Sequence, residues 1–160
     1  MRVSVHAVGR MKAGPEKDLA DRYFDRFAKA GPGVSLEFAG IFEIVESRGQ
    51  SPGERKADEA ARIMQKLQPA CELVLLDERG LNLASDDIAT HIARIRDAGR
   101  RDLAIAIGGP DGFDTEFRAK AGLVLSFGKA TWPHQMARVM LGEQLYRAAT
   151  ILSGHPYHRA

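Results

Sequence analysis

Blocks of apolar and amphipathic sequence alternate along the whole chain. Short apolar runs predict strands, and the stretches between them repeat their apolar positions at helical spacing. The predicted strands cover residues 2–8, 34–45, 71–76, 103–107 and 123–127, and the predicted helices cover residues 15–30, 54–67, 85–98, 116–121 and 133–152. This alternation predicts an α/β fold with a mainly parallel sheet and helices on both faces. It does not determine the strand order.

The stretch LAIAIGGPDG, residues 103–112, is a buried strand that ends abruptly in glycine. Ligands of open α/β sheets bind at the carboxyl ends of strands. Because Gly108 and Gly109 lack a Cβ, a ligand can approach their backbone and φ can be positive. Asp111 and Asp114 are candidate caps for the next helix. The loop matches neither GxxxxGK[ST] nor GxGxxG, which argues against a nucleoside triphosphate or a classical dinucleotide. A plain strand-to-helix turn is the alternative.

Three loops follow predicted strands: one after Leu76, one after Ile107 and one after Phe127. The carboxyl ends of parallel strands meet at one edge of a sheet. If these strands are parallel neighbours, we expect their loops to form one pocket.

The last predicted helix mixes polar and apolar residues on adjoining faces. Glu143 and Arg147 are four positions apart and can pair along the helix, with a solvated ion pair as the plain alternative. Gly142 in mid-helix costs about 1 kcal/mol relative to alanine. We therefore expect another helix to approach closely there, with a second subunit as one candidate source.

The carboxyl-terminal tail concentrates polar chemistry in His155, Tyr157, His158 and Arg159. Imidazoles exchange protons near neutral pH, an aromatic ring stacks on a nucleic-acid base, and a guanidinium holds a phosphate. A frayed chain end is the alternative.

Composition narrows the function classes. A chain of 160 residues with 44% hydrophobic residues predicts one domain, residues 1–160, with an ordinary core. The formal charge of +2 permits nucleic-acid binding without arguing strongly for it. The single cysteine, Cys71, excludes an internal disulfide, and no Cys/His spacing predicts a metal site. Without a signal peptide or membrane-length apolar run, we expect a cytoplasmic protein that binds neither metal nor membrane.

Three motifs together resemble the RlmH family: AIAIGGPDGF, LSFGKATWPHQMARVMLGEQLYRA and the terminal HPYHR. Members are bacterial SPOUT-class methyltransferases that methylate N3 of a pseudouridine in 23S ribosomal RNA. VSVHAVGRMK and LVLLDERG are also similar, so the resemblance spans nearly the whole chain. Trp132 stands where members usually carry another large apolar residue, and Asp111 stands where glutamate is common.

The resemblance implies a single SPOUT domain whose carboxyl-terminal part forms a deep trefoil knot. It further implies a homodimer that binds S-adenosylmethionine and acts on 23S rRNA, with assembled ribosomes as the expected substrate. The cofactor contacts that it implies are Leu76, Gly108, Gly109, Phe127, Gly128, Lys129, Ala130, Thr131 and Trp132.

The resemblance also yields candidate catalytic residues: His134, Arg138, His155, Tyr157 and His158. N3 must lose its proton at or before attack, and the three histidines are the candidate acceptors. Arg138 would orient phosphate or the cofactor carboxylate, as would Arg147, and Tyr157 would stack on the target base. Our hypothesis is that the tail of one subunit completes the pocket of the other. The competing interpretation is a non-catalytic ribosome-binding or nucleoside-sensing module.

Overall fold

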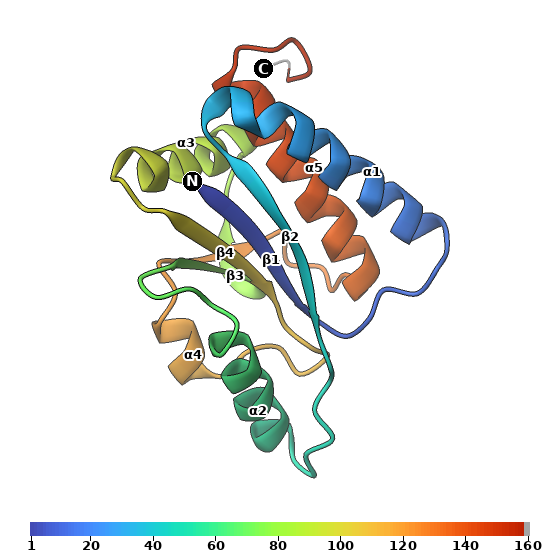
Figure 1. The fold of residues 1–160 in the computed structure, drawn as a ribbon. Coiled ribbons are helices and arrows are strands. Elements are labelled where there is room, and N and C mark those ends of the chain that lie inside the picture. The colour runs from blue at the N-terminus through green and yellow to red at the C-terminus, as the bar shows by residue number, and fades with distance from the viewer. Residues whose placement is uncertain (159–160) are drawn as a thin grey trace.

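A five-stranded, fully parallel sheet forms the centre of the computed structural model, which describes residues 1–158 (Figure 1). The strand order is β2-β1-β4-β3-β5, which confirms the predicted parallel sheet and supplies the order that the sequence pattern lacks. Arg159, the predicted phosphate contact of the tail, lies outside the described residues. The strands are β1 (Arg2–Val8), β2 (Glu37–Ile44), β3 (Glu72–Asn82), β4 (Asp102–Ile107) and β5 (Leu123–Ser126).

Helices cover both faces of the sheet, as predicted (Figure 1). The alternation of side chains along β4 defines the two layers, because Leu103, Ile105 and Ile107 pack on one side while Ala104 and Ala106 pack on the other. The larger layer contains α1 (Pro15–Ala30), α3 (Ser85–Asp97) and α5 (His134–Leu152), and the smaller contains α2 (Pro52–Met64) and α4 (Thr115–Ala119).

The close helix approach predicted at Gly142 is made by α1 of the same chain. A Cβ on Gly142 would lie 3.2 Å from the Cβ of Tyr23 and 3.2 Å from the ring of Phe24. The second subunit considered from the sequence is therefore not needed to explain this glycine. α5 lies directly against α1, and its first turn is thereby held at the carboxyl edge of the sheet (Figure 1).

Two predicted strand boundaries differ from the structure. Residues Gly31–Val34 form a 3₁₀ helix, so the second strand begins at Glu37. The third strand does not end at Leu76, because Leu81 and Asn82 pair with β5 after a register shift. Gly80 makes this return possible, since a Cβ there would lie 2.6 Å from the backbone of β5. Residues 77–80 are thus a bulge next to β5.

Candidate functional site

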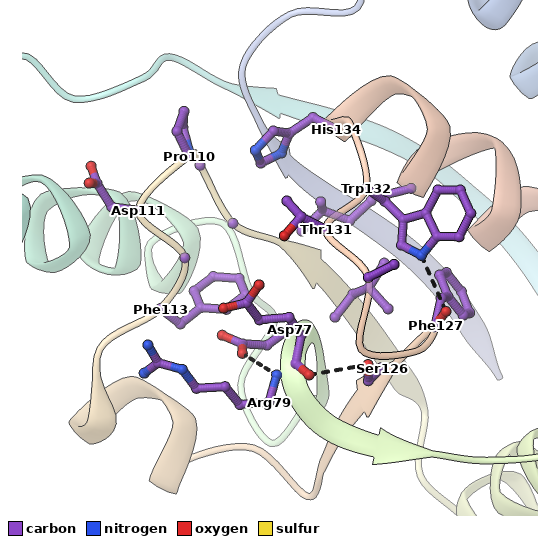
Figure 2. Close-up of a pocket in the computed structure, with 18 of the residues that line it drawn as sticks. Asp77, Arg79, Pro110, Asp111, Phe113, Ser126, Phe127, Thr131, Trp132 and His134 are labelled. Carbon is purple, nitrogen blue, oxygen red and sulfur yellow. Dashed lines mark hydrogen bonds between the residues drawn. The ribbon is translucent and has the colours of Figure 1, made fainter.

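A cavity opens at the carboxyl edge of the sheet, where the loops after β4 and β5 and the bulge of β3 meet (Figure 2). The structure confirms that the three chain segments singled out from the sequence line one pocket. Lys56 of α2 and His134 and Ala137 of α5 complete its wall. These strands are neighbours in the order β4-β3-β5, which brings the three segments together.

The predicted cofactor contacts converge on this cavity, apart from Lys129, which is exposed and outside its lining. Convergence of residues so far apart in the chain supports the predicted binding site, while the role of each residue stays a prediction. The predicted contacts that line the cavity are Leu76, Gly108, Gly109, Phe127, Gly128, Ala130, Thr131 and Trp132.

Gly108 and Gly109 are required by the packing beneath the loop. A Cβ on Gly108 would lie 3.2 Å from the ring of Phe113, and one on Gly109 would lie 2.7 Å from Oε2 of Glu59. Neither glycine has a positive φ, contrary to what their sequence context suggested. Within the loop, Gly112 carries the positive value, at 71°. The absent side chains thus let the loop rest on α2 and Phe113.

The two aspartates of this loop have different roles. Asp114 caps α4, because its Oδ1 accepts a hydrogen bond from the backbone N–H of Phe117 at 2.6 Å. Asp111 does not cap the helix but accepts two hydrogen bonds from Arg55 of α2, at 2.6 and 3.1 Å. Hydrogen bonding to that guanidinium lowers the pKa of Asp111. The prediction that both residues cap was wrong for Asp111.

Glu59 of α2 is a buried carboxylate beneath the cavity loop, with 4% of its surface exposed. Its Oε1 accepts a hydrogen bond from the backbone N–H of Ser47 at 2.9 Å. Arg55 makes a parallel link, because it donates to the carbonyl of Gly49 at 3.1 Å while holding Asp111. α2 therefore ties the polar loop after β2 to the cavity loop after β4.

The loop between β5 and α5 is organised by Ser126, which is buried. Its hydroxyl accepts a hydrogen bond from the N–H of Gly128 at 3.1 Å, and the hydroxyl oxygen lies 2.8 Å from the carbonyl oxygen of Gly128. It also lies 3.3 Å from the carbonyl oxygen of Glu78, which links β5 to the bulge of β3 (Figure 2). Trp132 folds back and donates from its indole to the carbonyl of Phe127 at 3.3 Å.

Sequence reasoning missed the acidic side of the cavity. The Asp77 side chain lines the cavity and is only 8% exposed. It accepts a hydrogen bond from the N–H of Arg79 at 2.9 Å, and Arg118 lies 3.9 Å from it. The motif LVLLDERG contains Asp77 and Arg79, but only the bulge of β3 turns Asp77 toward the cavity.

Two predicted catalytic residues of α5 have different surroundings. His134 lies at the cavity, whereas Arg138, one turn later, is outside its lining with its side chain 4% exposed. Arg138 donates to Glu43 at 2.8 Å, to the carbonyl of Val8 at 3.3 Å and to the carbonyl of Gly9. A catalytic role for Arg138 stays a prediction. In the structure its guanidinium binds groups at the ends of β1 and β2.

The carboxylate of Glu43 completes this contact. Burial alone would raise the pKa of Glu43, but the N–H of Met11 and the guanidinium of Arg138 bring the pKa below its ordinary value. Met11 N lies 2.7 Å from the carboxylate. The start of α5 is thereby fixed to the loop that follows β1.

The tail is docked on the far end of α5. The Tyr157 hydroxyl lies 3.2 Å from Glu143, and the Arg147 guanidinium lies 4.9 Å from the Tyr157 ring centre. Burial, a hydrogen bond with Tyr23 and the charge of Glu143 raise the pKa of Tyr157 to about 12. The predicted Glu143–Arg147 pair forms at 2.5 Å and, being largely buried, supports the tail rather than a solvated face.

The tail histidines also lie at this end of the molecule. His158 lies 3.2 Å from Asp86 of α3 and 3.1 Å from Arg147, and the His155 ring accepts from the N–H of Tyr157 at 3.1 Å. α5 contains 19 residues and therefore spans about 28 Å between His134 and the tail. None of His155, Tyr157 and His158 lines the cavity of the same chain.

Other chemistries find little support in the described part of the chain. Within residues 1–158, no three His, Cys, Asp or Glu side chains cluster as metal ligands would. Burial raises the pKa of the Cys71 thiol to about 11, which keeps it protonated near neutral pH and therefore weakly nucleophilic. None of the helices in residues 1–158 combines the length and apolar character that crossing a membrane requires.

Comparison with solved structures yields only a weak likeness. The SpoU methyltransferase AviRb from Streptomyces viridochromogenes, solved in complex with the cofactor AdoMet, is 14% identical. The match covers 92% of this chain and 59% of that chain, with a TM-score of 0.40. This score is too low for the likeness to bear on the fold.

Sequence comparison is decisive. The family described as "Predicted SPOUT methyltransferase" matches residues 1–158. A ribosomal RNA large subunit methyltransferase H from Mesorhizobium japonicum is 66% identical over 160 residues, covering 100% of both chains. The protein of the same name from Brucella anthropi is 62% identical, again over 100% of both. The chain thus belongs to the SPOUT methyltransferases and, among them, to the RlmH family of ribosomal RNA large subunit methyltransferases.

Proposed function

We propose that this chain transfers a methyl group from S-adenosylmethionine to N3 of a pseudouridine in the 23S rRNA of assembled ribosomes, in the cytoplasm. The observation that carries the proposal is the convergence of three strand-end segments on one cavity, at the residues expected to hold the cofactor. The names of the full-length relatives support large-subunit rRNA as the substrate. The family resemblance supplies the target atom and the carboxyl-terminal knot.

The cavity fits this cofactor in its chemical composition. Apolar side chains, among them Leu76 and Phe127, can cover an adenine ring, and the carboxylate of Asp77 can accept hydrogen bonds from ribose hydroxyls. A Cβ on Gly108 or Gly109 would collide with Phe113 or Glu59, so the two glycines let the loop pack closely where it lines the cavity. When bound, the cofactor supplies a methyl group on an electrophilic sulfonium. The chain itself supplies position and exclusion of water.

A base is needed because the attacking nitrogen must lose its proton. Among the cavity-lining residues that the structure describes, His134 is the only histidine. It stands at the first position of α5, and the buried contacts of Arg138 hold that turn in place. An imidazole is suited to accept a proton near neutral pH. We therefore favour His134 as the acceptor from within the subunit.

The proposal includes a homodimer in which the tail of one subunit reaches the cavity of the other. The length of α5, about 28 Å, keeps His155, Tyr157 and His158 from their own cavity. The contacts of Tyr157 and His158 with Glu143, Arg147 and Asp86 give the tail a defined path that a frayed end would lack. A two-fold pair would use both tails equally.

The experiment is transfer of labelled methyl from S-adenosylmethionine to ribosomes from a strain lacking its own enzyme. Mass spectrometry of the rRNA nucleosides identifies the product, which we expect to be N3-methylated pseudouridine. Ala130→Trp is the matched control, because Ala130 is exposed at the cavity lip and a large side chain there would fill the pocket without disturbing the core. Cofactor binding without transfer to any ribosomal RNA would instead support a binding module.

A further inference from the structure

We propose that Arg10, Lys12 and Arg48, which we call the basic rim, bind RNA phosphates beside the cavity. All three side chains are exposed and belong to the loops that follow β1 and β2. The inference rests on the proposed function, because it assigns a grip on the RNA to the methyltransferase site. It adds a surface to the chemistry of the cavity itself.

The two loops of the basic rim are neighbours. β1 and β2 are parallel with Val8 opposite Ile44, so the loops that follow the two strands leave the sheet at the same edge (Figure 1). The N–H of Gly9 donates to the carbonyl of Ile44 at 2.8 Å, which joins the two exits. A Cβ on Gly9 would lie 2.8 Å from a carboxylate oxygen of Glu46. The loop carrying Arg10 and Lys12 therefore packs beside the loop carrying Arg48.

Both loops are tied to the wall of the cavity. The carboxylate of Glu59 holds the N–H of Ser47, next to Arg48, and lies directly under Gly109. On the other side, the carbonyl of Gly9, next to Arg10, accepts from Arg138. Because Arg138 is one turn from His134, this contact holds the backbone next to Arg10 near the histidine side of the cavity. The basic rim is thus attached to the cavity by two buried charged groups.

Most carboxylates near the basic rim are engaged by other groups, although the charge of Arg10 helps to lower the pKa of Glu43. Glu43 binds Arg138 and the N–H of Met11, Glu54 accepts from the N–H of Gln50 at 2.9 Å, and Asp111 binds Arg55. Within residues 1–158, Arg10, Lys12 and Arg48 form no ion pair. Glu46 alone in these loops has no such engagement in the described chain.

An RNA strand fits this arrangement better than an acidic protein surface. A nucleotide whose base enters the cavity is joined to its neighbours through phosphates, which must then pass the cavity lip. Cationic side chains at that lip raise the affinity of the protein for RNA, because their binding to phosphates releases counterions from the RNA. The whole chain carries a net charge of only +2, so this local group of unpaired cations would contribute disproportionately to the grip.

The test is the triple variant Arg10→Gln, Lys12→Gln and Arg48→Gln in the full-length protein. The control is Lys66→Gln, Arg94→Gln and Arg101→Gln, which removes the same charge from exposed residues at the opposite edge. We expect the rim variant to raise KM for ribosomes roughly 10-fold while kcat and the Kd for S-adenosylmethionine stay unchanged. The slope of log binding constant against log salt concentration should become shallower by about 2 for the rim variant. Each lost phosphate contact on a single strand removes about 0.7 from the magnitude of this slope.

Several outcomes would overturn the inference. A rim variant with the wild-type KM, or a control variant whose KM rises equally, would show that these three side chains are not a specific grip. Unchanged affinity for naked 23S rRNA together with weakened ribosome binding would assign the rim to an acidic ribosomal protein. None of these results touches the proposed function, which fails only if the wild-type protein itself transfers no methyl group to rRNA.

Discussion

The guanidinium of Arg138 in α5 lies 2.8 Å from the carboxylate of Glu43 in β2, two residues that are 95 positions apart in the chain. The same guanidinium binds the carbonyls of Val8 and Gly9. This contact fixes the first turn of the last helix to the ends of the first two strands, and His134 lies in that turn.

Replacing Arg138 by Gln should lower the free energy of unfolding by about 2–3 kcal/mol, since it leaves two carbonyls and a partly buried carboxylate without their cation. Glu43→Gln should cost less, because the guanidinium keeps its two carbonyl partners. Urea unfolding of both single variants and the double variant measures the coupling. An Arg138→Gln protein of wild-type stability with a lost kcat would instead place Arg138 in the chemistry.

Deleting residues 155–160 should abolish methyl transfer while leaving the Kd for S-adenosylmethionine largely unchanged. The cavity is lined without any tail residue, whereas the proposed partner-subunit contact depends on the tail. Isothermal titration and labelled methyl transfer separate the two effects. Full activity of the truncated protein would refute a role for the tail.

Mixed dimers test whether the tail acts on the partner. Co-expression of the tail-deleted chain with the Ala130→Trp chain should restore about a quarter of wild-type activity, because half of random dimers then contain one complete site. The control replaces the tail-deleted chain by one carrying both changes, which leaves every site incomplete. If only the control level is seen, the tail acts within its own subunit or the two chains do not exchange.

Tyr157 should make stability fall more steeply in alkali than Phe would at the same position. Its folded pKa is raised from 10 to about 12, so between these values the folded chain keeps a proton that the unfolded chain has released. Stability therefore decreases as pH rises above 10 and the contribution is lost as pH passes the folded value. Thermal unfolding of wild type and Tyr157→Phe from pH 8 to 12 measures how the stability of each protein changes with pH. The two pH slopes should be equal below pH 9 and differ between pH 10 and 12.

Gly109→Ala should weaken S-adenosylmethionine binding about 10-fold, a cost of roughly 1.4 kcal/mol. The new Cβ would lie 2.7 Å from Oε2 of Glu59, so the loop must move away from α2 and into the cavity. Shortening the acid with Glu59→Ala in the same chain removes the collision and should recover part of the affinity. Gly33→Ala is a suitable control, since nothing lies within 4 Å of its Cβ position.

The layers of the fold and the position of the cavity follow from local patterns in the sequence. Apolar runs such as that from Leu103 to Ile107 mark buried strands, and glycines mark where those strands end. The strand order was not predictable, because pairing depends on contacts between segments that the local pattern does not encode. The return of β3 along β5 was missed for the same reason, since Gly80 is needed only once β5 lies beside it.

The site residues divide in the same way. The loop after β4 was found because adjacent glycines stand out in the sequence, although packing against Phe113 and Glu59, and not a positive φ, accounts for Gly108 and Gly109. The roles of Glu59 and Asp77 left none, because a single acidic residue on a charged helix or after a strand looks like ordinary surface. Arg138 and the tail residues were grouped as one site, although α5 places the buried arginine near one end of the sheet and the tail near the other.

The strand order has a consequence for how the protein folds. β4 lies between β1 and β3, both of which are synthesised earlier. The central strand is therefore the fourth of the five to be made, and it must pair with an exposed edge of β1 and an exposed edge of β3. Pairing of distant segments is slow compared with local helix formation. An incomplete chain can pair β1 with β2, but it has no wall for the cofactor. The capacity to bind the cofactor and the completed fold therefore arise in the same late step.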